Sequence, residues 1–133
     1  MNEAFESVRA FHQAFGVPAA GLPHMMAPGR VSRRANWISD EVQEFRDAVS
    51  LADQADAMID IIYFALGGLV EMGIKPDGLF SIVQAANMAK LWPDGTAHFR
   101  SDSKILKPPG WVDPRPAIEA EIDKQVRGES THG

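Results

Sequence analysis

A carboxylate stands in the middle of the most apolar stretch of the chain, and this feature restricts the fold more than any other. Asp60 lies in the run AMIDIIYFALGGLV, which has almost no other polar side chain and no lysine or arginine within one helical turn. Burying an unpaired carboxylate costs several kcal/mol, so its partner must come from another segment or be a bound cation. The stretch from Ala55 to Val70 is shorter than the roughly 18 to 20 residues that a membrane-spanning helix needs. It also holds two aspartates, and we expect no membrane span.

Apolar residues recur three and four positions apart along most of the chain, which predicts an all-α fold. Four helices are expected over about 2–15, 32–50, 53–72 and 76–90, with Ser32 and Asp53 as the N-caps of the second and third. A short extended excursion over 96–114, or one hairpin, precedes a C-terminal helix near 117–126, and 128–133 is expected to be a flexible tail. We therefore predict a single domain over 1–133 with a four-helix-bundle-like arrangement.

Composition argues against several classes of function. The 133-residue chain has no cysteine, which excludes disulfides, a thiolate nucleophile and a cysteine-type zinc site. Its net charge of −5 argues against binding of polymeric nucleic acid through a basic face. The N-terminal segment MNEAFESVRAF carries acids and no apolar core, unlike a secretory signal or a basic presequence. We expect a cytoplasmic protein.

Acidic residues on two neighbouring predicted helices form the candidate site. Glu41 and Glu44 project within about 60° of each other and Asp40 and Glu44 within about 40°, while Asp56 and Asp60 are four residues apart on the next helix. If the two helices pack antiparallel, their acidic faces converge. Carboxylates so placed repel each other unless a hard divalent cation lies between them, and oxygen ligands favour magnesium over zinc. The alternative is a solvated acidic face with Asp60 in a buried hydrogen bond.

Four ordered segments resemble the MazG-like, all-alpha NTP pyrophosphatases: SDEVQEF, DAMIDIIYFALGG, AANMAKLWPDG and KILKPPGW. They are most similar to the branch related to phosphoribosyl-ATP pyrophosphohydrolase that contains dimeric dUTPase-like enzymes. The resemblance runs from about Phe11 to Pro114. It implies hydrolysis of a nucleoside triphosphate, ribo or deoxy, to the monophosphate and pyrophosphate. It also implies two or more Mg²⁺ ions per site, for which Mn²⁺ could substitute.

The resemblance implies metal-binding roles for Glu41, Glu44 and Asp60, with Asp40 or Glu41 orienting or deprotonating the attacking water. This sequence departs from the commoner E-x-x-D spacing of the family, because Ala57 stands three residues before Asp60. Asp56, one residue earlier, is the substitute ligand that we expect.

The same resemblance implies a set of substrate-binding residues. Asn87 and Lys90 match the block that faces the nucleotide and its phosphates in relatives. Lys104 and Lys107 lie in the segment that closes over the phosphate tail, although Ser103 stands where glycine is usual. Judged without the resemblance, Asn87 could cap a helix, Lys90 could complement a helix dipole, and the other two could be surface lysines.

Histidine and tryptophan side chains are candidates for base recognition. His12 could read a base edge, although a histidine on an apolar stripe is more often part of the core. Trp37, Trp92 and Trp111 could stack on a base, and core packing is again the alternative. Arg33 and Arg34 are expected in the first turn of a helix, where a cation is unfavourable, which indicates an anionic partner or an ion pair with an acid on another helix.

The resemblance further implies a homodimer or a dimer of dimers. Gly67 and Gly68 support this independently, because they permit close backbone approach on a helix that is apolar nearly all round. For the substrate we favour a deoxynucleotide, with dGTP (or GTP) and dUTP foremost. The alternatives are a phosphoribosyl-ATP-type substrate or a non-catalytic helical interaction module that binds a basic partner.

Overall fold

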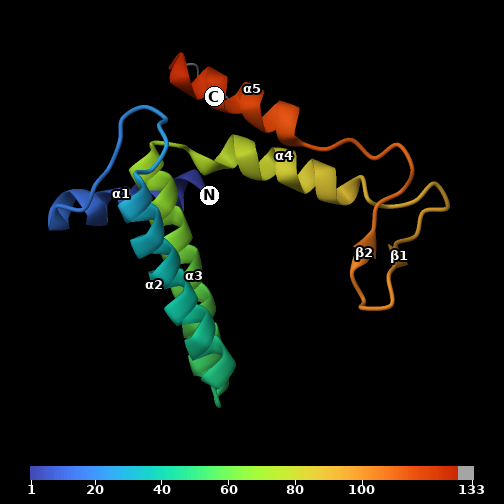
Figure 1. Ribbon diagram of the computed structural model, residues 1–133, viewed down its shortest axis with the longest axis horizontal. Helices are drawn as coiled ribbons and strands as arrows, with labels where there is room; N and C mark the ends of the chain where they lie inside the picture. Colours follow the sequence, from blue (N-terminus) through green and yellow to red (C-terminus); the bar gives the residue numbers. More distant parts are fainter. Residues whose placement is uncertain (129–133) are drawn as a thin grey trace. The chain divides into compact units, whose positions relative to one another are not determined.

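The computed structural model describes residues 1–128, and the chain divides into two compact units that meet between Pro76 and Asp77. The first unit contains three helices, α1 (Asn2–Phe15), α2 (Pro28–Asp47) and α3 (Leu51–Met72) (Figure 1). The second contains most of α4 (Pro76–Met88), a hairpin of β1 (His98–Phe99) and β2 (Ile105–Leu106), and α5 (Arg115–Val126). The predicted all-α fold, with its short extended excursion and C-terminal helix, is confirmed.

The core of the first unit lies between α1 and α3. Phe5 and Val8 on α1 are buried against Leu66 and Val70 on α3, with Leu69 packed beside them. The α1 residues belong to the apolar stripe that the sequence predicts, and Gly16 ends the helix in the left-handed conformation, with φ 70°. Hydrophobic burial therefore fixes α1 on one side of α3 and leaves α2 to pack along another.

The start of α2 differs from the prediction. The helix begins at Pro28 behind an extended Ala27, whose φ and ψ are −61° and 146°. Proline suits this first position because its fixed φ matches the helix and it has no N–H to satisfy. Ser32 therefore lies inside the helix, and its assignment as an N-cap was wrong.

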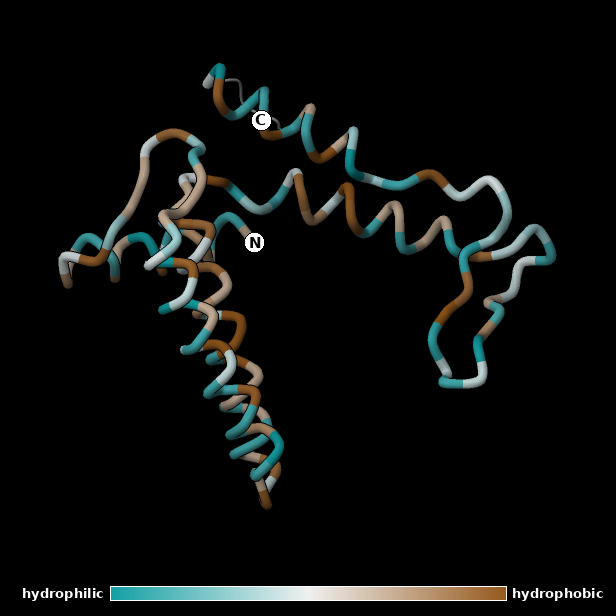
Figure 2. Tube along the Cα trace, in the orientation of Figure 1, coloured by the Kyte–Doolittle hydropathy of each residue, from teal (hydrophilic) through white to brown (hydrophobic). Residues whose placement is uncertain are grey.

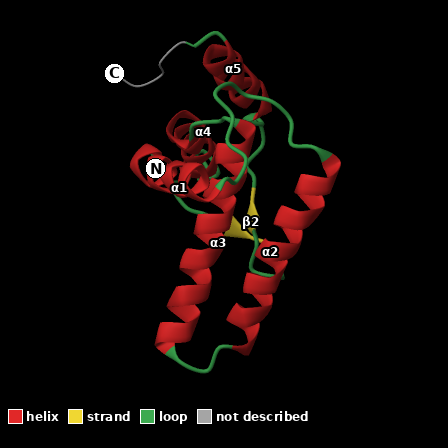
Figure 3. Cartoon of the chain, turned by 90° about the vertical axis from the view of Figure 1, so that its left-hand side faces the viewer, coloured by secondary structure: helices red, strands yellow, loops and turns green. Residues whose placement is uncertain are grey.

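The connection between α2 and α3 also differs from the prediction. Ala48 is extended, with φ −64° and ψ 133°, so α2 ends at Asp47 rather than near Ser50. The Ser50 hydroxyl accepts a 3.1 Å hydrogen bond from the Asp53 N–H and is the true N-cap of α3, so the assignment of Asp53 was wrong. This short connection lets α2 and α3 run side by side (Figure 3).

The extended excursion of the second unit is a two-stranded antiparallel hairpin. His98 pairs with Leu106, and the Arg100 N–H donates to the Lys104 carbonyl at 2.8 Å across the turn. Ser103 in that turn has a φ of 69°, which is the left-handed region that glycine adopts most easily. The position at which the resemblance leads us to expect glycine thus has the backbone conformation that favours glycine.

The ends of the second unit agree with the prediction in outline. α4 ends at Met88, two residues before the predicted end, and α5 covers the predicted C-terminal helix. Of the predicted tail, only Gly128 lies within the described residues.

Hydrophobic residues recur along α3 (Figure 2). Even so, no single helix within residues 1–128 is long and apolar enough to cross a membrane, although α3 and α4 taken together would meet that length and composition requirement.

Candidate active site

Three carboxylates converge between α2 and α3. One oxygen from each of Glu41, Glu44 and Asp60 lies within 4.8 Å of the others. Glu41 and Glu44 are one turn apart on α2, and Asp60 reaches them from α3 because the two helices pack side by side. The predicted convergence of the two acidic faces is confirmed, and the spacing is close enough for all three side chains to ligate one cation.

The proximity of the carboxylates changes their protonation. A hydrogen bond to Glu44, followed by loss of hydration and the negative charges of neighbouring acids, raises the pKa of Glu41 to about 7. Burial and the nearby charges of Asp56 and Glu44 raise the pKa of Asp60. Glu41 Oε2 is buried and has no hydrogen-bond partner among residues 1–128. An acceptor oxygen without a donor, in a cluster of like charges, is the environment that a bound cation would stabilise.

The other two predicted acids lie beside this cluster. Asp56 is exposed, one turn before Asp60, and lines a pocket of about 270 Å³ together with Glu44 and Asp53. Asp40 is exposed on α2 next to Glu41. Ala57 is only 2% exposed, so an acid at that position would be buried in the helix packing, whereas Asp56 projects into solvent.

His12 and Trp37 line one cavity of about 140 Å³, together with four other side chains and Arg34. The Trp37 ring stacks on Phe64, with 5.8 Å between the ring centroids. Trp37 is one turn before Glu41 on α2, and Phe64 is one turn after Asp60 on α3. The cavity therefore lies about 6 Å along the helix pair from the carboxylate cluster.

The His12 side chain is buried in the wall of this cavity. His12 is 3% exposed, and its Nδ1 lies 2.8 Å from the Pro18 carbonyl oxygen. Because a carbonyl only accepts hydrogen bonds, Nδ1 is the donor of this contact, while Nε2 lies beside Gly67, 3.1 Å from where a Cβ there would be. The alternative of a satisfied core histidine therefore holds for Nδ1, and the role of His12 in base recognition stays a prediction.

A buried ion-pair network supports this cavity, and its acid Glu71 and second arginine Arg30 were not identified from the sequence. Glu71, 4% exposed on α3, accepts hydrogen bonds from Arg30 and Arg34 of α2. Arg34 also donates to the Phe64 carbonyl at 3.1 Å, and its guanidinium carbon lies 5.3 Å from the centroid of the Trp37 ring. Two arginines one turn apart, with a lone acid near the end of an apolar helix, are the signal that would have predicted this network.

This ion-pair network bears on the interpretations of Arg34 and Gly67 given above. Of the two alternatives proposed for Arg34, the ion pair with an acid on another helix is the one observed, and the acid is Glu71. Arg33 is exposed. Gly67 provides room for that arginine, since a Cβ there would be 2.4 Å from Arg34 Nη1. Close approach at Gly67 is thus made by a side chain of the same chain.

The remaining predicted substrate residues belong to the second unit. Asn87 is exposed in the last turn of α4, and Lys104 is exposed in the hairpin turn. The ammonium groups of Lys90 and Lys107 lie 5.8 and 4.5 Å from the ring centroid of Trp111. The structure thus places Lys90 and Lys107 against one ring and Lys104 in the hairpin turn.

Comparison with known proteins agrees with this geometry. Residues 8–87 match the sequence model of the phosphoribosyl-ATP pyrophosphohydrolase family. The chain belongs to this family. The matched residues include the three-carboxylate cluster and every side chain that lines the aromatic cavity. The resemblance to the MazG-like, all-alpha superfamily is therefore confirmed.

One solved structure extends the likeness over nearly the whole chain. The crystal structure of a candidate NTP pyrophosphohydrolase from Exiguobacterium sp. 255-15 is 32% identical, with a TM-score of 0.54. The match covers 96% of this chain and 98% of that one, so it includes the hairpin and α5 beyond the family match. Among curated proteins no match is found. Both likenesses indicate pyrophosphohydrolase activity.

Proposed function

We propose that this member of the phosphoribosyl-ATP pyrophosphohydrolase family is a magnesium-dependent nucleoside triphosphate pyrophosphohydrolase. It would convert a triphosphate and water into the monophosphate and pyrophosphate. The observation that carries the proposal is the convergence of Glu41, Glu44 and Asp60 within 4.8 Å, with one buried Glu41 oxygen lacking a hydrogen-bond partner among the described residues.

The donor set fits magnesium. All three clustered groups are carboxylates, and Mg²⁺ binds one or two such groups while it keeps waters and takes substrate phosphates. Asp56, which lines the adjacent pocket with Glu44, is the residue that would hold a further ion. When bound, the metal would supply an activated water and offset charge on the phosphates, and Mn²⁺ could replace it.

Individual side chains would then take the proton of the attacking water and offset the negative charge of the leaving pyrophosphate. Asp40 or Glu41 would orient or deprotonate the water that attacks the α-phosphorus. Lys90, Lys107 and Lys104 would offset negative charge on the leaving pyrophosphate, with Asn87 hydrogen-bonding to the nucleotide.

The aromatic cavity supports a role in base recognition. Trp37 offers a ring face one helical turn from Glu41, and His12 Nε2, which lies beside Gly67 of α3, would be the acceptor for a base edge. Guanine and uracil each present a ring N–H that such an acceptor would bind. This favours GTP, dGTP or dUTP as the substrate.

Exposed apolar residues on α3 support the proposed homodimer or dimer of dimers. In the single chain Ile59 is 60% exposed, Ile62 48% and Tyr63 39%. Contiguous exposed apolar residues on one helix are typical of an interface. Light scattering that finds only a monomer would contradict this part of the proposal.

A substrate panel tests the activity. Pyrophosphate release would be measured with Mg²⁺, coupled inorganic pyrophosphatase and malachite green over the eight common NTPs and dNTPs. Phosphoribosyl-ATP belongs in the panel because the family description favours it as the second candidate substrate. We expect Glu44→Gln and Asp60→Asn to abolish turnover with the fold intact, and Glu3→Gln, on an exposed part of α1, to retain it. Release from none of these substrates would favour the interaction module.

A further inference from the structure

A tight turn precedes the Trp111 side chain and fixes the backbone from which it projects. The turn is formed by Pro108, Pro109, Gly110 and Trp111, directly after Lys107. The Trp111 N–H donates to the Pro108 carbonyl at 3.2 Å, and Gly110 has a φ of 80°. Proline at the second position and a positive φ at a glycine in the third are the features of a type II turn. The proline and the glycine before Trp111 therefore fix the backbone conformation at this residue.

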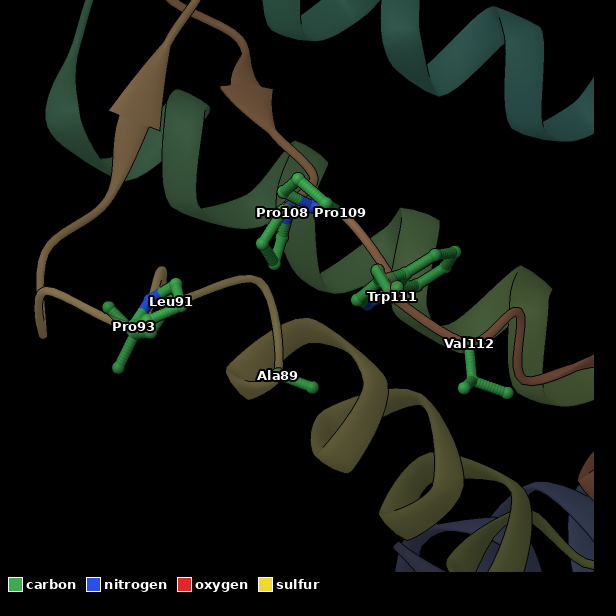
Figure 4. Close-up of a pocket in the computed structure, with 8 residues that line it drawn as sticks. Ala89, Leu91, Pro93, Pro108, Pro109, Trp111 and Val112 are labelled. Atoms are coloured by element: carbon green, nitrogen blue, oxygen red, sulfur yellow. The ribbon is translucent and has the colours of Figure 1, made fainter.

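The indole of Trp111 is anchored to α4. Its Nε1 donates to the Ala86 carbonyl at 2.8 Å, and Ala86 lies in the last turn of that helix, where carbonyls lack helical partners. Beside this contact is a cavity of about 350 Å³, lined by Trp111, Ala89, Pro109 and Val112 among others (Figure 4). The hydrogen bond joins the turn to the end of α4 and sets the orientation of the ring.

Two lysines from separate segments lie over this anchored ring. Lys107 Nζ, from the segment after β2, is 4.5 Å from the ring centroid, and Lys90 Nζ, just beyond α4, is 5.8 Å away. Two like charges gathered at one side chain repel each other, and the negative potential of the indole faces offsets part of this repulsion. Each contact lies within the roughly 6 Å over which cation–π attraction acts.

We propose that Trp111 is a positioning residue that holds Lys90 and Lys107 together for the polyphosphate tail of the substrate. This inference rests on the proposed function only in taking these lysines as the phosphate-binding pair. The proposal also gives the two tryptophans different roles. Trp111 orients cations through its ring while its indole N–H donates to a carbonyl of α4, whereas Trp37 lines the cavity proposed for the base.

Calorimetric binding of inorganic pyrophosphate tests the proposal without depending on turnover. We expect Trp111→Leu to weaken binding about five- to tenfold, since both cation–π contacts are lost. Trp111→Phe keeps a ring but loses the N–H that anchors it to the Ala86 carbonyl, so it should recover only part of the affinity. Val112→Ala, at an exposed position in the same cavity lining, should bind as the wild type does.

A double-mutant cycle separates positioning from general damage to the fold. In a Lys90→Met/Lys107→Met background, Trp111→Leu should cause no further loss, because Trp111 acts through those lysines. The same loss in both backgrounds would overturn the proposal, as would wild-type affinity in Trp111→Leu.

Turnover measurements keep this inference distinct from the proposed function. If nucleotides are hydrolysed, Trp111→Leu should raise KM more than it lowers kcat. Pyrophosphate binding that depends on Trp111, without hydrolysis of any nucleotide, would sustain the inference and refute the proposed function. Hydrolysis of a nucleotide, with a pyrophosphate affinity that does not depend on Trp111, would support the proposed function and refute the inference.

Discussion

Replacing Glu71 by glutamine tests the network that joins α2 to α3 behind the aromatic cavity. Glu71 is the shared acceptor of Arg30 and Arg34, and the side chains of Glu71 and Arg34 are 3% and 7% exposed. Glutamine keeps the shape and removes the charge, so the substitution would leave two arginines without their counter-ion.

The expected loss of folding free energy follows from the burial of the ion pair. Breaking a buried ion pair by removing one partner costs about 3–5 kcal/mol, and the partial exposure of Arg30, at 25%, places the expected value near the lower figure. For a chain of this size, about 3 kcal/mol lowers Tm by roughly 10 °C.

The pH dependence has a defined sign. Burial opposes ionisation of Glu71, but hydrogen bonds from Arg30 and Arg34 outweigh it and hold its pKa below the ordinary value of 4.5. The stabilisation from Glu71 is thus fully present above about pH 4.5 and is lost as the pH falls through the lowered pKa. The difference between wild type and variant should shrink in acid.

Urea and thermal unfolding at pH 7.5 and at pH 3.5 provide the assay. Glu6→Gln is the matched control in the same unit, because Glu6 and Arg9 form an exposed pair at 3.9 Å and such pairs contribute little. If Glu71→Gln unfolds within about 0.5 kcal/mol of the wild type at pH 7.5, the network does not stabilise the helix pair as argued.

Three further predictions concern other parts of the chain. Mg²⁺ affinity should fall as the pH drops below about 7, since protonated Glu41 cannot ligate; equal calorimetric affinity at pH 6 and pH 8 would argue against this. Ser103→Gly should relieve left-handed strain of about 1 kcal/mol and slow hydrogen exchange of the Arg100 amide, and unchanged exchange would count against it. Gly67→Ala should lower Tm, because its Cβ would clash with Arg34; a Tm equal to that of the wild type would show that the guanidinium moves aside.

Periodic features of the sequence were sufficient for most of the fold. The stripe through Phe5 and Val8 predicts the buried face of α1, and the isolation of Asp60 in an apolar helix predicts that acids on α2 meet it. Both follow from the fixed rotation of a helix per residue, which local sequence determines.

Helix ends were harder to predict because several residues compete for each cap. Ser32 and Asp53 are chemically suitable caps, but Pro28 begins α2 one turn earlier, and Ser50 accepts the N–H of Asp53. Nothing local marks the end of α2 at Asp47, since neither glycine nor proline follows it directly. Competition between neighbouring cap and first-turn residues therefore decides where α2 and α3 begin.

The partners in two other long-range contacts were not identified from the sequence. The pairing of Glu71 with Arg34 spans the connection between helices, and the contacts of Lys90 and Lys107 with Trp111 depend on a turn. Spacing along one element says nothing about such pairs, although the lone acid Glu71 was a usable signal.

Titration calorimetry with Mg²⁺ tests the central claim most directly. We predict saturable binding to the wild type at pH 8, and none to Glu44→Gln or Asp60→Asn when both variants retain the helical circular dichroism of the wild type. Saturable binding of equal strength to both variants, or no uptake of Mg²⁺ or Mn²⁺ by the wild type, would contradict the assignment of these carboxylates as a metal site.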